Sequence, residues 1–168
     1  MTGAELLVDG FGRVRDSALA AVDGLTEDQL THRVDPDANT IAWLVWHLAR
    51  VQDDHVAEAA GSQQAWTSGG WSDRFGLPLE VGDIGYGNSS AEVASVRASA
   101  DLLAGYLSAV HERTVAYVDG LADGDLDRVV DDSYDPPVTF AVRLVSLLSD
   151  DLQHAGQAAL LRGVVERA

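Results

Sequence analysis

Two residues near the C-terminal end of the chain, Asp150 and His154, are spaced to hold one metal ion. Four residues apart on a helix, their side chains point in directions only about 40° apart, one turn above the other. His47 lies far away in the sequence, in an apolar run between Trp46 and Leu48, where an imidazole needs a partner or a ligand. If the two segments pack together, one carboxylate and two imidazoles form a facial triad with positions open for water or substrate. The sequence therefore predicts a divalent-metal site at His47, Asp150 and His154.

Each member of this set also has an ordinary structural explanation. A buried histidine often bonds a backbone carbonyl, and an Asp–His pair at a four-residue spacing is a common surface contact on helices. Asp151 is a second possible carboxylate ligand, three residues before His154 and about 60° to the other side. Both steps are usable on a helix, and the four-residue step favours Asp150.

Two polar residues follow His47 on the same predicted helix. Asp54 is seven residues further on and only about 20° from His47 in projection, so it can bond a metal ligand or accept a proton. A carboxylate near a helix end can equally be an exposed surface group. His55 lies about 80° round the helix, which favours a supporting or surface position over direct metal binding.

Two arginines and a tryptophan complete the set of candidates. Arg50, one turn from His47, and Arg143, near the start of the last predicted helix, can bind a substrate carboxylate or form surface salt bridges. Trp46 is expected in the core, with one ring edge available to line a pocket. The sequence assigns no residue a catalytic role.

Apolar periodicity predicts four long helices that position these residues. Apolar side chains recur at steps of three and four residues over about 3–23, 41–60, 89–118 and 138–165. Thr26 and Gln29 have capping-box spacing and predict a short extra helix. No segment alternates with a period of two for long enough to be a strand. We therefore expect an all-α four-helix bundle, with residues 1–168 forming one domain.

The long segment between the second and third predicted helices, residues 61–88, shows no helical period and is rich in glycine. Its aromatic residues argue against disorder and favour an ordered lid over a pocket: Trp66, Trp71, Phe75 and Tyr86. Elsewhere a weak repeat appears, since Asp23-Gly24-Leu25 and Leu30 recur 96 residues later as Asp119-Gly120-Leu121 and Leu126. This repeat predicts two helix pairs related by a pseudo-twofold axis.

Composition narrows the possible partners. The chain has 27 acidic and 11 basic residues, a formal net charge of −16 that disfavours binding to nucleic acid or to anionic membrane surfaces. No apolar stretch is long enough for a membrane span, so we expect a cytoplasmic protein. The chain has no Cys, which excludes disulfides and a protein thiol nucleophile. All the basic residues are Arg, which suggests a high-GC genome.

The residues around the candidate site resemble the DinB superfamily over nearly the whole chain. The resemblance rests on three motifs: Trp46-His47-Leu48, Asp150-x-x-x-His154-x-Gly156-Gln157 and Leu161-Arg162. A carboxylate four residues before the last histidine is similar to the mycothiol-dependent maleylpyruvate isomerase branch. That branch usually has Glu where this chain has Asp150, so its carboxylate reaches one methylene further.

The resemblance implies a DinB-like four-helix bundle with a divalent metal, zinc or nickel, at the predicted triad. It further implies an enzyme that activates a low-molecular-weight thiol, mycothiol, for transfer to a small electrophile or for its isomerisation. A high-GC genome fits an actinobacterium that uses mycothiol. Two alternatives stay open: a metal- or small-ligand-binding bundle without turnover, and a structural homodimer formed through the bundle faces.

Overall fold

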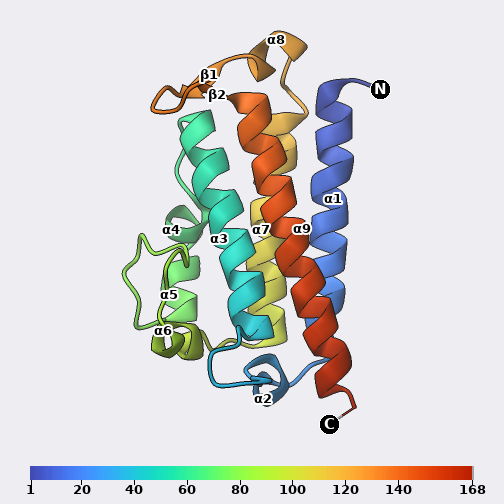
Figure 1. Ribbon diagram of the computed structural model, residues 1–168, viewed down its shortest axis with the longest axis vertical. Helices are drawn as coiled ribbons and strands as arrows, with labels where there is room; N and C mark the ends of the chain where they lie inside the picture. Colours follow the sequence, from blue (N-terminus) through green and yellow to red (C-terminus); the bar gives the residue numbers. More distant parts are fainter. Residues whose placement is uncertain (168) are drawn as a thin grey trace.

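Four long helices lie side by side in the computed structural model, which describes residues 1–167 (Figure 1). They are α1 (Gly3–Val22), α3 (Ile41–Ala60), α7 (Ala100–Val118) and α9 (Phe140–Val165). Both α7 and α9 pack against α1 and α3, so each long helix has two long neighbours. The predicted all-α four-helix bundle is confirmed. Among the described residues, no helix has the length and apolar character needed to cross a membrane.

The long helices begin where a hydroxyl side chain can cap them. In each case a Thr or Ser accepts a hydrogen bond from a backbone N–H three residues later: Thr2, Thr40, Ser99 and Thr139. At its other end, α3 stops at Gly61, which adopts the left-handed conformation with φ of 62°. Every residue of α3 from Ile41 to Asp53 is buried, which explains its almost unbroken apolar sequence.

Two short helices follow the two Asp-Gly pairs of the weak repeat. Helix α2 (Glu27–Leu30) follows α1, and helix α8 (Asp123–Leu126) follows α7 at the equivalent position 96 residues later. The Thr26 hydroxyl accepts from the backbone N–H of Gln29, so the capping box predicted for the extra helix is present.

The predicted continuous helix over 89–118 is wrong. The structure has α6 (Ser90–Ser95), a break, and then α7. The chain leaves the helical conformation at Val96, whose ψ is 93°, and the Ser99 hydroxyl caps a new helix by accepting from the backbone N–H of Leu102. The Ser99 cap therefore decides where α7 begins, although the apolar periodicity continues through it. The cap satisfies a backbone N–H group that would otherwise lack a partner.

Two other expectations need correction. Residues 61–88, predicted without helix, contain α4 (Ala65–Ser68) and α5 (Trp71–Phe75), each about one turn long. The chain also has strands, β1 (Val129–Asp131) and β2 (Val138–Thr139), which pair antiparallel with Val129 opposite Thr139. Helices and strands this short cover too few residues to establish a hydrophobic period.

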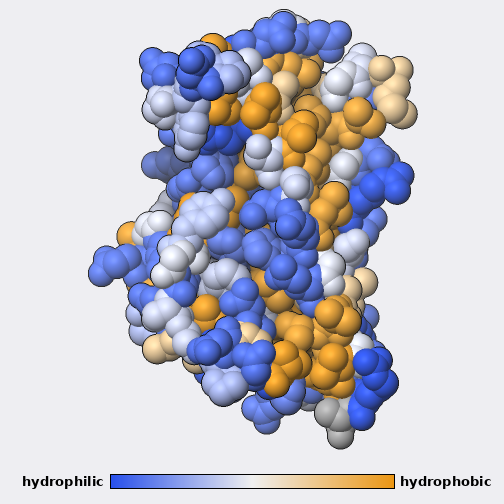
Figure 2. Space-filling model, viewed as in Figure 1, coloured by the Kyte–Doolittle hydropathy of each residue, from blue (hydrophilic) through white to orange (hydrophobic). Residues whose placement is uncertain are grey.

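The surface shown in Figure 2 carries apolar side chains along α9. The exposed ones on this helix are Val142, Val145, Leu152 and Leu160. They lie on the outer face of α9, while Leu144, Leu147 and Ala155 on its inner face are buried. The predicted homodimer stays a prediction.

Candidate metal centre

His47 on α3 meets Asp150 and His154 on α9. Each offers one ligand atom, and these atoms lie within 4.8 Å of one another. The ring centroids of the two histidines are 4.9 Å apart, and His154 Nε2 lies 3.6 Å from Asp150 Oδ1. Two imidazoles and one carboxylate from facing helices of a bundle form a donor set suited to a divalent metal.

The His47 ring is oriented by the backbone of a distant segment. Its Nδ1 donates a hydrogen bond to the carbonyl oxygen of Ile84. Because a carbonyl oxygen can only accept, the ring proton belongs on Nδ1 and the Nε2 lone pair is free for a metal. His47 is 2% exposed, and this burial lowers its pKa, an effect that the bond to Ile84 partly opposes. The neutral imidazole is the form that binds metals.

Asp150 and His154, the two candidate ligands on α9, also have atoms free for a metal. His154 Nδ1 lies 3.2 Å from Gln157 Oε1, one turn along α9, and a bond there leaves Nε2 free. Asp150 Oδ2 is buried and has no hydrogen-bond partner within residues 1–167. A buried carboxylate oxygen without a partner is costly, and a cation beside it would remove that cost. The three residues therefore fit a divalent metal.

Asp151 faces a different environment from Asp150. It is fully buried on the inner face of α9, and neither of its oxygens has a hydrogen-bond partner in the described part of the chain. Burial, and then the nearby Asp150 carboxylate, raise the pKa of Asp151 well above its usual value. The charged form of Asp151 is thus disfavoured, whereas Asp150 lies beside His154.

The segment Asp83–Asn88, which we call the strap, is fastened to one face of α3. Trp43 Nε1 donates to Asn88 Oδ1 at 3.0 Å, and Arg50 Nε donates to the Asp83 carbonyl at 3.1 Å, on either side of the His47–Ile84 bond. Trp43, His47 and Arg50 are spaced to share that face. Asp83 also accepts from the backbone N–H of Gly85 at 2.7 Å, which closes the strap on itself.

Aromatic rings and one glycine pack directly on His47. Trp43 stacks on it at a centroid distance of 4.5 Å, and Tyr86 meets it edge-on at 5.3 Å. Gly85 has a φ of +101°, and a Cβ there would overlap His47 Nδ1. Ile84 and Gly85 were not predicted as site residues, and Tyr86 was predicted only as an aromatic residue of the expected lid. The glycines around Tyr86 were the only sequence signal of a close approach to the backbone.

The match to known proteins now identifies the family. A model of the DinB superfamily matches residues 11–158, most of the chain. This protein belongs to the DinB superfamily. A solved structure of similar shape, a conserved protein from Enterococcus faecalis, is 30% identical with a TM-score of 0.92, over 100% of this chain and 99% of that one. None of the curated proteins compared with the chain matches it.

Three predicted residues of this DinB protein lie toward the 61–66 segment instead of the triad. Arg50 is fully buried, so the surface salt bridge considered for it is wrong; it donates to Gln64 Oε1 at 2.9 Å. Gln64 in turn donates to Asp54 Oδ1 at 2.6 Å. Trp46 is buried as expected, with its ring 6.4 Å from that of Trp66. These three side chains hold the connection that follows α3.

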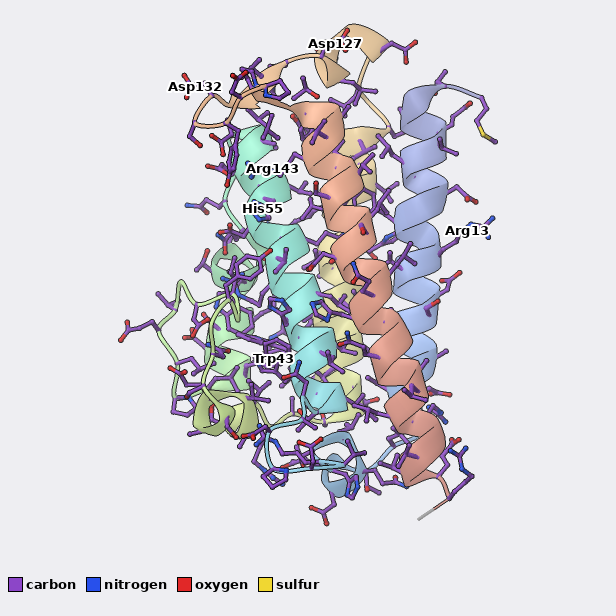
Figure 3. All side chains as sticks on the ribbon, in the orientation of Figure 1. Arg13, Trp43, His55, Asp127, Asp132 and Arg143 are labelled. Carbon is purple, nitrogen blue, oxygen red and sulfur yellow. The ribbon has the colours of Figure 1, made fainter. Side chains whose placement is uncertain are left out.

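His55 and Arg143 lie together toward the end of α3 that is near β1 and β2 (Figure 3). Arg143 Nη1 donates to His55 Nδ1 at 2.9 Å. Both line a hollow of about 380 Å³ that also reaches Asp150, Tyr86 and, on the β1–β2 connection, Tyr134. The candidate metal centre therefore opens on a pocket between α3 and α9.

Proposed function

We propose that this protein is a metal-dependent enzyme in which His47, Asp150 and His154 bind one divalent cation, zinc or nickel. The observation that carries the proposal is the convergence of the three side chains, with Nδ1 of both histidines engaged by other groups. Membership of the DinB superfamily supports it. Three protein ligands leave coordination positions open, as catalytic metal sites require.

The proposed reaction is transfer of a low-molecular-weight thiol to a small electrophile, or isomerisation of that electrophile. A bound divalent metal lowers the pKa of a thiol and presents it as a thiolate at neutral pH. The chain contains no Cys, so the thiol must come from a small molecule, and mycothiol is the one that the family resemblance implies. Burial, and then Asp150, raise the pKa of Tyr86, so its hydroxyl stays protonated and can donate a hydrogen bond at the pocket.

Metal analysis of protein purified without chelator tests the ligand set. We expect about one metal per chain in the native protein, and close to none in His47→Ala or His154→Ala while the helical circular dichroism persists. Asp150→Asn should weaken metal binding at least about tenfold more than the matched Asp151→Asn. Full occupancy in a histidine variant would remove that residue from the ligands, and the reverse ranking of the aspartates would reassign the carboxylate.

Cobalt substitution tests the thiol. Addition of mycothiol should produce a sulfur-to-cobalt charge-transfer band in the near ultraviolet, and the band should strengthen as pH rises, because the metal takes the thiolate and releases a proton. A cobalt spectrum indifferent to both mycothiol and bacillithiol would contradict thiol activation. The protein would then be a metal-binding bundle with another role.

A further inference from the structure

The polar groups of the α3–α9 pocket are unequally distributed between its two ends. One end holds Asp150, next to both histidines of the triad. The other end holds Arg143 and His55, with the Asp131 carboxylate beside Arg143, and four apolar side chains also line the pocket: Val51, Val138, Val142 and Leu147. A ligand that fills this pocket is therefore elongated, with polar groups at its ends and an apolar body.

Arg143 has more hydrogen-bonding capacity than its protein neighbours use. Within residues 1–167 it donates one hydrogen bond, to His55, and none to an oxygen atom. Seven other arginines each donate two or more hydrogen bonds to protein oxygens: Arg13, Arg15, Arg33, Arg50, Arg97, Arg128 and Arg162. A guanidinium has five N–H donors in a planar fork, so several donors of Arg143 are available to a ligand.

The nearest carboxylates do not satisfy this guanidinium. Asp131 Oδ2 lies 3.6 Å and Glu58 Oε2 lies 3.8 Å from Arg143 nitrogens. Charge-assisted hydrogen bonds between Arg and carboxylates are about 2.7–2.9 Å long. Both acids therefore attract Arg143 and keep it in place without forming the bidentate pair for which its shape is suited.

His55 adds a second donor beside Arg143. Its Nδ1 accepts from Arg143, so the ring proton belongs on Nε2. Burial, and then the Arg143 charge, lower the pKa of His55 and keep its ring neutral at pH 7. The Arg143 end of the pocket thus combines a guanidinium, whose donors Asp131 and Glu58 leave unused, with a neutral N–H donor, a combination that suits a carboxylate.

We propose that the pocket binds an elongated carboxylic acid whose carboxylate pairs with Arg143, held by His55, and whose other end reaches the metal centre. The inference rests on the proposed function for the role of the second end. Arg143 and Asp150 are seven residues apart on α9, about 20° apart in projection and about 10 Å apart along the axis. Acids of two or three carbons are too short to reach both ends.

The carboxylate end can be tested without any metal. Metal-free protein labelled with ¹⁵N is titrated with hexanoate or with 1-hexanol while the Arg143 Nε–H and His55 ring signals are followed. Hexanoate should shift both signals saturably, and hexanol should bind at least about tenfold more weakly. Equal effects of the acid and the alcohol would overturn the proposal.

Matched variants show whether Arg143 itself makes the contact. Arg143→Gln should remove the preference for hexanoate, and Arg143→Lys should keep part of it, because the charge remains and the planar fork is lost. Arg128→Gln removes the same charge from a neighbouring exposed arginine and should keep the full preference. A preference that survives in a folded Arg143→Gln protein would overturn the proposal.

The length of the pocket is tested with thiols on cobalt-substituted protein. The affinity of 8-mercaptooctanoate, measured from its sulfur-to-cobalt band, should exceed that of 8-mercaptooctanol by about tenfold, and Arg143→Gln should abolish the difference. Mercaptoacetate should show no such dependence on Arg143. A band with equal affinities for the long acid and alcohol contradicts this inference and leaves the proposed function standing. Absence of a band with every thiol contradicts the proposed function, and the hexanoate titration still decides on the carboxylate.

Discussion

The bundle has two long connections, and they are built in opposite ways. Residues 61–99, between α3 and α7, include buried residues along their whole length, from Ala65 and Trp66 to Ala98. Residues 119–139, between α7 and α9, contain α8 and the two-stranded sheet, and none of them is buried. The first connection orients His47, a candidate metal ligand, through the strap, while the second borders the far end of the pocket through Asp131 and Tyr134. The buried connection thus sets the orientation of His47, and the exposed connection forms part of the rim of the pocket.

Polar side chains of α3 explain why the first connection is fixed. Asp53, which is buried, accepts from the backbone N–H groups of Ala65 and Trp66, both at 2.8 Å, and from the Tyr106 hydroxyl at 2.9 Å. Arg50 lies 3.8 Å from Asp53 and bonds the strap. Burial of charged groups is costly unless they are paired, so these bonds favour one position of the connection.

The largest expected effect is a difference in stability between two variants, each of which lacks an arginine that bonds one of the two connections. Arg50→Met leaves Asp53 buried without its cation and removes the bond to the strap, which should lower the free energy of unfolding by about 3 kcal/mol. Arg128→Met also removes an arginine that bonds a backbone carbonyl, that of Ala59, but on the exposed connection. Its cost should be about 0.5 kcal/mol. Urea unfolding measures both, and equal losses would contradict the comparison.

A smaller effect concerns the strap and the metal. Gly85→Ala places a Cβ against His47 Nδ1, and the ring must move, so metal affinity should fall at least about tenfold. Gly87→Ala is the matched control, because Gly87 also has a positive φ, of 74°, but a Cβ there meets no atom within 4 Å. Competition with a metallochromic chelator gives the affinities. Similar losses in the two variants would show that backbone strain, and not the contact with His47, is responsible.

The smallest expected effect is a pH dependence at His55, which lies on α3 and lines a hollow with Val129 and Val130 of the exposed connection. Burial and Arg143 lower the pKa of His55, so between the ordinary value of about 6.5 and the folded value the unfolded chain binds a proton that the fold does not. The free energy of unfolding should therefore fall as pH drops from about 7.5 to 5.5, by at most about 1.4 kcal/mol per pH unit for this group. His55→Gln should reduce that slope in metal-free protein. An unchanged slope in urea titrations would assign the effect to other groups.

The long helices and the Asp150–His154 pair could be predicted because both rest on short-range spacing, whereas the addition of His47 depended on the packing of two distant helices. A four-residue step fixes the relation of Asp150 to His154 whatever the rest of the chain does, and apolar periodicity locates the helices. The break between α6 and α7 was missed because Ser99 interrupts a pattern that otherwise continues. The strands, α4 and α5 were missed because each covers too few residues to establish a hydrophobic period.

The surroundings of the triad could not be predicted, since they depend on contacts across more than thirty residues of sequence. The bonds from His47 and Arg50 to the strap end on backbone carbonyls, which every residue type carries. For the same reason Arg50 was expected at the surface: its type suggested exposure, and only the folded connection supplies its partners. The pairing of His55 with Arg143 likewise joins helices distant in the sequence.

The carbonyl of Ile84 has a consequence for how the site can change over evolution or by design. A main-chain acceptor cannot be removed by replacing a side chain, so the identity of residue 84 is free to drift within the limits of packing while the His47 ring keeps its orientation. The length of the strap has no such freedom, because one residue inserted or deleted between Asp83 and Asn88 would move the acceptor itself. What must be kept in this part of the site is therefore the number of residues in the strap and the absence of a side chain at Gly85.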